Sequence, residues 1–208
     1  MPACVSALSP ALLLEATALR CERGNVALFA DLDLALQAGD CVWLRGANGC
    51  GKTTLLRTLA GLRPADGGQL QRRAALRYLG HSNGLKDELS LLEGLRFTAH
   101  WQGLAADEAA LLEALRFFEL LPLRRRPARS LSQGQRRRAA LAPLALAQPG
   151  SCWLLDEPFD ALDDQGVTLL CQLIQRHGAA GGATLFTSHQ ALAPLAGVRQ
   201  LQLDGARP

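Results

Sequence analysis

Lysine, long apolar runs and paired cysteines are scarce or missing in this chain, and each shortage excludes a class of protein. Only two of the 22 basic residues are lysines, Lys52 and Lys86. The most apolar runs, 11–18 and 139–147, are far shorter than the roughly 20 residues that a membrane span needs. No basic stretch precedes a long apolar one at the start, so we expect no secretory signal and a protein that works in the cytoplasm, alone or against a membrane partner.

The six cysteines are scattered, and none forms a C-x-x-C pair. Free thiols in a reducing compartment are therefore favoured over a disulfide framework or a zinc site. Cys50 lies within a glycine-rich segment. Either a small residue is needed there or the thiol senses redox state, and the first interpretation is favoured.

Length and charge indicate one compact domain. A chain of 208 residues with 49% hydrophobic content can bury the core of a single α/β domain with a small insertion. The net charge of +3 is too mild to imply a nucleic-acid partner. Arginines gather at 124–126, 129 and 136–138, and we favour a solvated face. Contact with anionic lipid or an acidic partner is the alternative, and nucleic acid ranks third because no aromatic residues interleave with the arginines.

Hydrophobic patterning predicts strands that alternate with helices. Turns are expected at 24–25 and 64–68, Pro127 marks a boundary, and Pro143 should bend the helix that contains it. Alternating elements in the first and last thirds imply a mostly parallel, covered sheet, into which a helical subdomain of residues 85–130 is inserted between core segments 1–84 and 131–208. Strands are expected at 12–19, 32–36, 41–44, 76–79, 153–155, 184–187 and 201–203, helices at 53–61, 132–146 and 164–177, and helical spacing runs from 89 to 123.

Residues 46–53 match the pattern G-x-x-x-x-G-K-[ST], after a predicted strand and at the start of a predicted helix. Glycines permit positive φ, so that backbone N–H groups turn inward around phosphate oxygens, and the helix N-terminus adds positive potential. Lys52 supplies a full charge to the β- and γ-phosphates, and the Thr53 hydroxyl ligates Mg²⁺. The predicted nucleotide-binding residues are Gly46, Ala47, Asn48, Gly49, Cys50, Gly51, Lys52, Thr53 and Thr54.

A second cluster follows the apolar strand at 153–155, which ends in Asp156 and Glu157. Ligands gather at the carboxyl ends of parallel strands. Asp156 is therefore predicted to lie near Mg²⁺, and Glu157 to act as the general base that polarises water. The alternative, a solvated turn or helix cap, receives less weight because the phosphate loop stands upstream.

A third feature is the start of the helix at 132, where Ser132 is a natural N-cap and Gly134 permits close backbone approach. With Gln135 these residues form another helix N-terminus suited to an anion. Two phosphate-facing termini for one triphosphate suggest a homodimer in which each nucleotide is held between two copies. The alternative is that the helix is merely well capped.

Together these residues resemble the ABC transporter ATPase family. Residues 131–135 resemble its signature motif with Gln133 in place of glycine, 161–163 resemble its D-loop, and His189 resembles the switch histidine that contacts the γ-phosphate. The resemblance implies a P-loop NTPase (RecA-like) fold with an N-terminal antiparallel β part. It also implies ATP as substrate, Mg²⁺, head-to-tail homodimerisation, catalytic roles for Lys52, Glu157 and His189, and a membrane-spanning permease at the cytoplasmic face of the inner membrane.

Within the family, residues 79–86 resemble the haem exporter ATPases of cytochrome c maturation. In this segment His81 stands at the position where most members of the family have glutamine. This implies a role in haem export or in release of a haem-carrying chaperone. His81 either senses Mg²⁺ or the γ-phosphate, or makes only a local hydrogen bond. His100 and His177 are expected on the surface, Trp43 and Trp153 in the core, and Trp101 in either setting.

Two other functions remain open from the residues. One is an ABC-type ATPase that assembles another complex or moves a different substrate. The other is a different P-loop kinase or GTPase, which the segment at Ser132 and His189 argue against. In the family an aromatic residue often stacks on adenine, whereas the corresponding segment here is Cys21-Glu22-Arg23.

Overall fold

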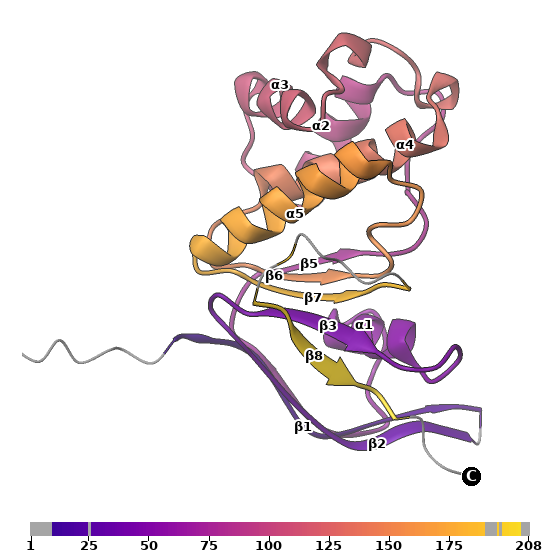
Figure 1. The fold of residues 1–208 in the computed structure, drawn as a ribbon, viewed down its shortest axis with the longest axis vertical. Coiled ribbons are helices and arrows are strands. Elements are labelled where there is room, and N and C mark those ends of the chain that lie inside the picture. Colours follow the sequence, from indigo (N-terminus) through magenta and orange to yellow (C-terminus); the bar gives the residue numbers. More distant parts are fainter. Residues whose placement is uncertain (1–9, 25, 190–194, 196, 205–208) are drawn as a thin grey trace, which may run out of the picture.

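The computed structural model describes residues 10–24, 26–189, 195 and 197–204. None of the helices in these ranges has the length and apolarity needed to cross a bilayer. Figure 1 shows an antiparallel sheet at one end, a parallel sheet in the middle and a helical region at the other end. The elements follow in the order β1 (Leu12–Arg23), β2 (Val26–Gln37), β3 (Cys41–Arg45), α1 (Lys52–Leu59), β4 (Gly67–Arg72), β5 (Leu76–Leu79), α2 (Leu91–Trp101), α3 (Glu108–Phe117), η1 (Leu121–Leu123), η2 (Ala128–Ser130), α4 (Gln133–Leu141), η3 (Ala142–Leu146), β6 (Cys152–Leu155), α5 (Asp164–Ala179), β7 (Ala183–Thr187) and β8 (Arg199–Gln202).

The antiparallel sheet has the order β2-β1-β4. β1 and β2 form a long hairpin, and both strands extend beyond the predicted ranges 12–19 and 32–36. β4 was not predicted, because its start at Gly67 falls in the expected turn and its polar sequence, GGQLQR, lacks an apolar alternation. Pairing with β1, a tertiary effect, supplies what local propensity does not.

The second sheet has the order β5-β6-β7-β3-β8, and every strand pair in it is parallel. The prediction of a mostly parallel sheet beside an antiparallel part is therefore confirmed. In such a sheet all carboxyl ends lie along one edge. The phosphate loop after β3 and the acidic pair after β6 consequently start from the same edge.

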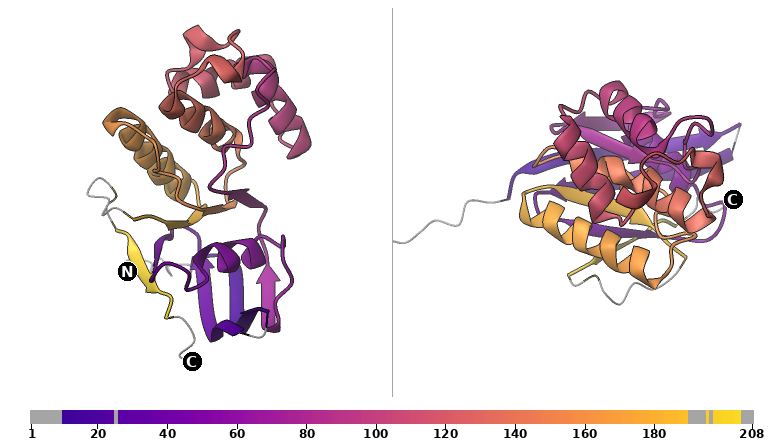
Figure 2. Two further views of the ribbon diagram at one scale, coloured as in Figure 1. Left: turned by 90° about the vertical axis from the view of Figure 1, so that its right-hand side faces the viewer. Right: turned by 90° about the horizontal axis from the view of Figure 1, so that it is seen from above.

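Separate apolar clusters cover the two faces of the parallel sheet. On β6, Cys152 and Leu154 belong to the cluster shared with α1 and the antiparallel sheet, whereas Trp153 and Leu155 belong to the cluster shared with α5 and the helical region. This follows from the two-residue period of a strand. Figure 2 shows α1 between the two sheets, where its buried residues are Leu55, Leu56, Thr58 and Leu59.

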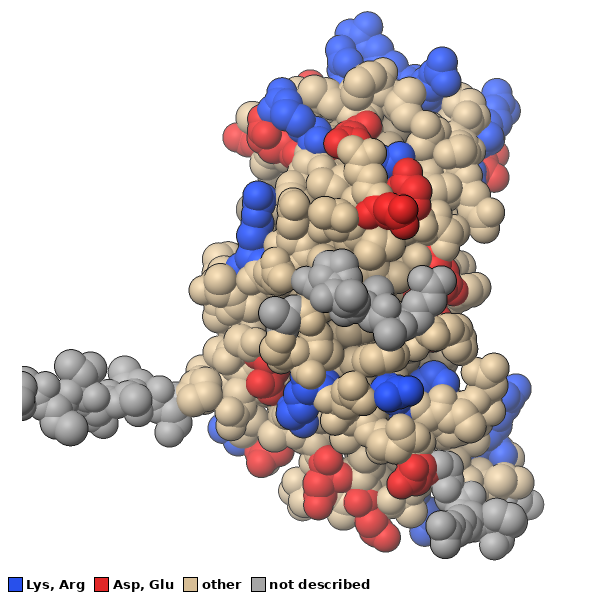
Figure 3. Space-filling view, in the orientation of Figure 1, with Lys and Arg blue, Asp and Glu red and all other residues tan. Residues whose placement is uncertain are grey.

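The helical spacing expected from 89 to 123 is divided between two α-helices, α2 and α3, in the segment between β5 and α4. Ser90 caps α2 through a capping box, and Asp107 caps α3. Gly103, at φ +65°, lies in the break between them. Arginine side chains gather at the outer end of this region, and Figure 3 shows basic groups there on the face that it presents.

The predicted helix at 132–146 changes character at Pro143. The α-helix α4 ends at Leu141, and residues 142–146 continue as the 3₁₀ segment η3. Proline lacks the N–H that an α-helix needs and clashes with the preceding turn. The expected distortion is thus a change of helix type.

Two aromatic environments differ from expectation. Trp153 is buried, as predicted, but Trp43 is only half-buried and stacks on Phe186. The prediction that His177 lies on the surface was wrong, since its side chain is 6% exposed and stacks on Trp153. His177 follows Leu170 and Ile174 by helical spacing on α5, which places it on the buried stripe. His100 is exposed, as predicted, and Trp101 is 81% exposed.

Candidate nucleotide-binding site

The loop between β3 and α1 is shaped by glycines in conformations that other residues rarely adopt. Gly49 has φ +83° and Gly51, the N-cap of α1, has φ +106°. A Cβ on Gly46 would lie 2.6 Å from the Leu203 carbonyl oxygen and from Cys50 Sγ. The first turn of α1 holds no acidic residue. The loop therefore presents a helix N-terminus with no carboxylate in its own first turn to oppose an anion.

Lys52 folds back over this loop. Its Nζ donates hydrogen bonds to the carbonyl oxygens of Gly46 at 2.8 Å and Ala47 at 3.1 Å. Lys52 lines a cleft of about 390 Å³, which is within the usual size range of small-molecule sites. The cleft is lined by Arg23, Leu28, Asn48, Gly49, Gly51, Lys52, Thr53, Thr54, His81, Asp156, Glu157 and His189.

Asp156 and Glu157 follow β6 directly and are both buried. Thr187, the last residue of β7, joins them: its Oγ1 accepts a hydrogen bond from the Glu157 N–H at 2.8 Å and donates one to Asp156 Oδ1 at 3.0 Å. Because β6 and β7 are parallel neighbours, this hydroxyl fixes the acidic pair to the sheet edge. The predicted convergence of the acidic pair with the phosphate loop is present.

The Glu157 carboxylate is paired with His189. The His189 N–H donates to Glu157 Oε2 at 3.1 Å, and His189 Nε2 lies 3.5 Å from Oε1. Burial raises the pKa of Glu157, and the charge of His189 partly opposes that rise. A carboxylate with a raised pKa is a stronger base, which suits general-base catalysis.

The backbone of Glu157 is strained. Its φ is +48°, in the left-handed region that residues other than glycine rarely occupy. Such a conformation costs on the order of 1–3 kcal/mol and persists only where the surroundings hold it. Hydrogen bonds at both Glu157 backbone groups do so here: the N–H donates to Thr187 Oγ1, and the carbonyl oxygen accepts from Arg137 Nη2.

His81, in the segment between β5 and α2, lines the cleft, and its Nδ1 lies 3.7 Å from Asp160 Oδ2. The sequence analysis named neither Arg23 nor Leu28 as a cleft residue, although the resemblance matched the segment 21–23 to the place where the family contacts adenine. Both belong to the β1–β2 hairpin, which reaches the phosphate loop only through the tertiary fold. The motif carries no signal for them.

Three residues of the phosphate loop, Gly46, Ala47 and Cys50, are absent from the residues that line the cleft. Ala47 offers its carbonyl oxygen to Lys52. Cys50 packs against the apolar cluster beneath the loop, and a Cβ on Gly46 would meet its Sγ. This packing supports the interpretation of Cys50 as a small space-filling residue.

The start of α4 lies apart from the residues that line the cleft. Ser132 and Gln135 form a capping box, in which Ser132 Oγ accepts from the Gln135 N–H at 3.3 Å and Gln135 Oε1 accepts from the Ser132 N–H at 3.0 Å. A Cβ on Gly134 would lie 3.2 Å from the Ala161 carbonyl oxygen, which places this turn against residues 161–163. Within one copy, this terminus and the phosphate loop do not form a single site.

The donor set of the cleft suits Mg²⁺. Thr53 offers a hydroxyl and Asp156 a carboxylate, both hard oxygen donors, and both line the cleft beside Lys52. Mg²⁺ in nucleotide sites is typically held by one or two such groups and by phosphate oxygens. No group of three or more His, Cys, Asp or Glu side chains that could hold a metal ion occurs among the described residues.

Comparison with known proteins agrees with this geometry. Residues 29–160 match the family model described as ABC transporter. The chain is 45% identical over 201 residues to the cytochrome c biogenesis ATP-binding export protein CcmA of Methylococcus capsulatus, covering 91% of this chain and 97% of that protein. It is 44% identical over 204 residues to the protein of the same name from Cupriavidus necator, covering 92% and 88%.

Among solved structures, one titled "Structure of ATP binding subunit of ABC transporter" superposes with a TM-score of 0.77 at 26% identity and covers 85% of this chain and 79% of that one. Fold, cleft and sequence similarity agree. The chain belongs to the ABC transporter family, as an ATP-binding subunit that hydrolyses ATP.

Proposed function

We propose that this chain powers an export step in c-type cytochrome biogenesis, with haem or a haem-carrying chaperone as the cargo that the resemblance implies. Relatives that match over more than nine-tenths of this chain carry the name of a cytochrome c biogenesis export protein. The observation that carries the ATPase part is the shared cleft of Lys52, Asp156 and Glu157. The cargo rests on the relatives alone.

In this proposal each cleft residue has a chemical task. The loop N–H groups and Lys52 hold the β- and γ-phosphates. Thr53 and Asp156 would hold Mg²⁺, which would neutralise charge on the phosphate oxygens when bound. Glu157 accepts a proton from the attacking water, and His189 keeps the Glu157 carboxylate oriented.

We propose that two copies complete the site. Ser132, Gly134 and Gln135 lie outside the cleft of their own chain, on a helix N-terminus suited to phosphate. A head-to-tail homodimer would bring this terminus to the nucleotide of the second copy. Each nucleotide would then be enclosed from both sides.

The permease is proposed to dock in a groove between the segment that follows β5 and the helical insertion of residues 85–130. This groove of about 280 Å³ is largely apolar and is lined at one side by Phe97 and Trp101, which are 51% and 81% exposed. The two rings stack with centroids 6.5 Å apart. Such a patch fits a short amphipathic segment on the cytoplasmic side of a membrane protein, which supports the proposal that the chain is peripheral at that face.

The test uses Glu157→Gln in two assays. In purified protein, the substitution should abolish phosphate release yet leave ATP binding intact and shift the protein to a dimer in size-exclusion chromatography. In cells that lack the native gene, wild type should restore c-type cytochromes and the variant should not. Unchanged phosphate release would refute the general-base assignment, and restored cytochromes with an inactive variant would refute the coupling.

An ABC-type ATPase that assembles another complex, or moves another substrate, is the second candidate. The exposed Phe97–Trp101 pair favours the transporter, because an apolar groove needs a partner surface. Trp101→Ala should weaken co-purification with the permease and leave phosphate release by the purified chain unchanged. Recovery of the native chain without any membrane protein would favour the assembly role.

A further inference from the structure

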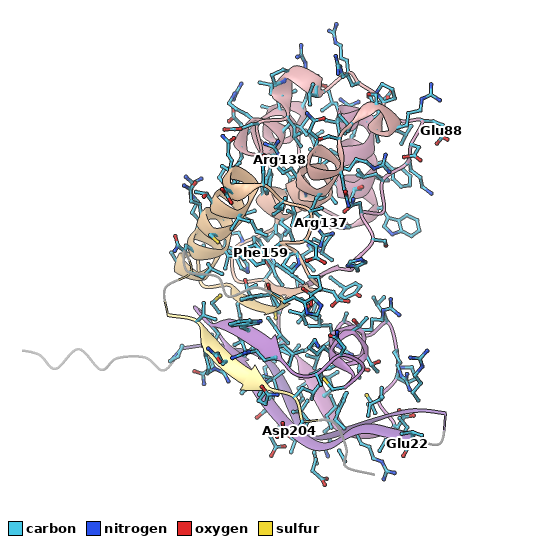
Figure 4. All side chains as sticks on the ribbon, turned by 45° about the vertical axis from the view of Figure 1, so that its right-hand side comes forward. Glu22, Glu88, Arg137, Arg138, Phe159 and Asp204 are labelled. Atoms are coloured by element: carbon cyan, nitrogen blue, oxygen red, sulfur yellow. The ribbon has the colours of Figure 1, made fainter. Side chains whose placement is uncertain are left out.

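A buried positive charge lies beside the catalytic segment and is not used by the proposed chemistry. Arg137, in the middle of α4, is 2% exposed. It is the sole buried lysine or arginine in the described part of the chain. Figure 4 shows it between the helical region and the parallel sheet. Burying an unpaired guanidinium is strongly unfavourable, so its surroundings must compensate the charge.

The compensation comes from acceptors on two different segments. One set follows β5: Arg137 Nη1 contacts the carbonyl oxygens of Gly80 at 3.4 Å and His81 at 3.3 Å, and the Asn83 Oδ1 at 3.1 Å. These acceptors belong to the stretch that carries His81 into the cleft. One side of the guanidinium fork is therefore committed to that stretch.

The other set follows β6. Nη2 donates to the carbonyl oxygens of Asp156 at 3.3 Å and Glu157 at 2.6 Å, and Nε donates to that of Pro158 at 3.2 Å. The charges of Asp160, Asp156 and Glu157 also favour the cationic form of Arg137, against burial, which lowers its pKa. All three guanidinium nitrogens are thus engaged, and one planar group spans both segments.

The contact with Glu157 has a specific mechanical effect. Thr187 holds the N–H of Glu157 and Arg137 holds its carbonyl oxygen, on either side of the left-handed φ of +48°. The strained conformation therefore depends partly on α4. The N-terminus of that same helix is the capped turn at Ser132.

We propose that Arg137 is a positioning residue that makes the Ser132 end of α4, the His81 stretch and the Glu157 stretch move as one unit. Contact of the Ser132 turn with a nucleotide on a second copy is thereby transmitted to the catalytic carboxylate of its own chain. This inference rests on the proposed dimer. It assigns to one guanidinium the coupling between the two nucleotide sites.

Arg137→Lys and Arg137→Gln test this assignment in steady-state phosphate release by the full chain. The Lys variant keeps the charge but cannot span both segments, so both variants should lower kcat by about tenfold or more, as expected for misplacement of a reacting group. Binding of a fluorescent ATP analogue should change less than about threefold, because the phosphate loop is untouched. The Hill coefficient for ATP should fall toward 1 in both variants.

A substitution at Asn83 keeps the test decisive if Arg137 substitutions fold poorly, and wild-type kcat in that variant would then overturn the inference. Asn83→Ala removes a single acceptor of Arg137 and should lower kcat by a few-fold without lowering nucleotide affinity. In the double variant with Arg137→Gln, the two effects should not add. Arg125→Gln, which removes the same charge from an exposed position, is the matched control and should behave as wild type.

Wild-type kcat and Hill coefficient in folded Arg137→Lys would overturn the inference, as would strictly additive effects of Asn83→Ala and Arg137→Gln. A loss of kcat with an unchanged Hill coefficient would reduce Arg137 to a structural support and also overturn it. Absence of ATP hydrolysis by wild type would instead refute the proposed function, so the two failures are distinguishable.

Discussion

Protonation of His177 should destabilise the folded chain at mildly acidic pH. Its ring lies flat against Trp153, with centroids 3.7 Å apart and an interplanar angle of 6°. On the other side, a Cβ on Gly182 would lie 2.1 Å from the ring, so no space for water exists there. Burial lowers the pKa of His177 from its ordinary 6.5 to about 4, and backbone groups of Ala183 and Ser151 oppose this only in part.

The linkage between proton binding at His177 and folding sets the sign and size of this change in stability. Because the unfolded chain binds the His177 proton more tightly than the folded chain, stability rises with pH between about 4 and 6.5 and is unaffected by this group above that window. Because one pKa unit corresponds to about 1.4 kcal/mol, protonation of His177 lowers the free energy of unfolding by on the order of 3 kcal/mol in all. About 2 kcal/mol of it should be lost between pH 7 and pH 5.

The assay is urea unfolding, followed by circular dichroism from pH 4.5 to 7.5, of wild type and His177→Phe. The variant keeps a ring against Trp153 but cannot be protonated, so its free energy of unfolding should lose about 2 kcal/mol less than that of wild type on acidification to pH 5. Any overpacking next to Gly182 is independent of pH and cancels in this comparison. His100→Gln, at an exposed site, should follow wild type. Parallel curves for wild type and His177→Phe would refute the reasoning.

Three further outcomes follow from the cleft. Since Glu157 must be deprotonated to act as base and burial raises its pKa, phosphate release should fall on acidification with a midpoint above the ordinary 4.5 of glutamate, in a pH–rate profile. Thr187→Val should leave the Glu157 N–H without a side-chain acceptor and lower stability by about 1–3 kcal/mol, measured by urea unfolding, with Thr168→Val on the exposed face of α5 as control. Gly51→Ala should weaken binding of a fluorescent ATP analogue, since φ +106° strains alanine and its Cβ would lie 3.1 Å from Leu28; unchanged affinity would contradict the role given to this turn.

Local patterns predicted much of the fold because they coincide with tertiary structure here. The phosphate-loop motif stands between β3 and α1, and the apolar run at 153–155 is the buried strand β6. Pro143 marks the change from α4 to η3. β4 escaped prediction because its six residues carry no apolar alternation and its partner is distant in sequence.

The candidate site was predicted where one residue type answers one chemical need, as with Lys52, Asp156 and Glu157. The prediction of the site was incomplete where a residue acts through its place in the fold. Arg23 reaches the cleft from a hairpin, and Arg137 lies in a run of three arginines that resembles a solvated face. Only the fold distinguishes the buried Arg137 from its neighbours Arg136 and Arg138, which form ion pairs with Asp87 and Glu119.

The reciprocal hydrogen bonds between Ser132 and Gln135 stabilise the separate subunit relative to the proposed dimer. A phosphate that approaches this turn competes with Ser132 Oγ for the Gln135 N–H and with Gln135 Oε1 for the Ser132 N–H. Loss of such a cap costs about 1 kcal/mol, and a symmetric pair of subunits would lose two caps. In the proposed dimer, both turns would regain their internal partners once hydrolysis removes the outer phosphate, which would favour separation of the two copies.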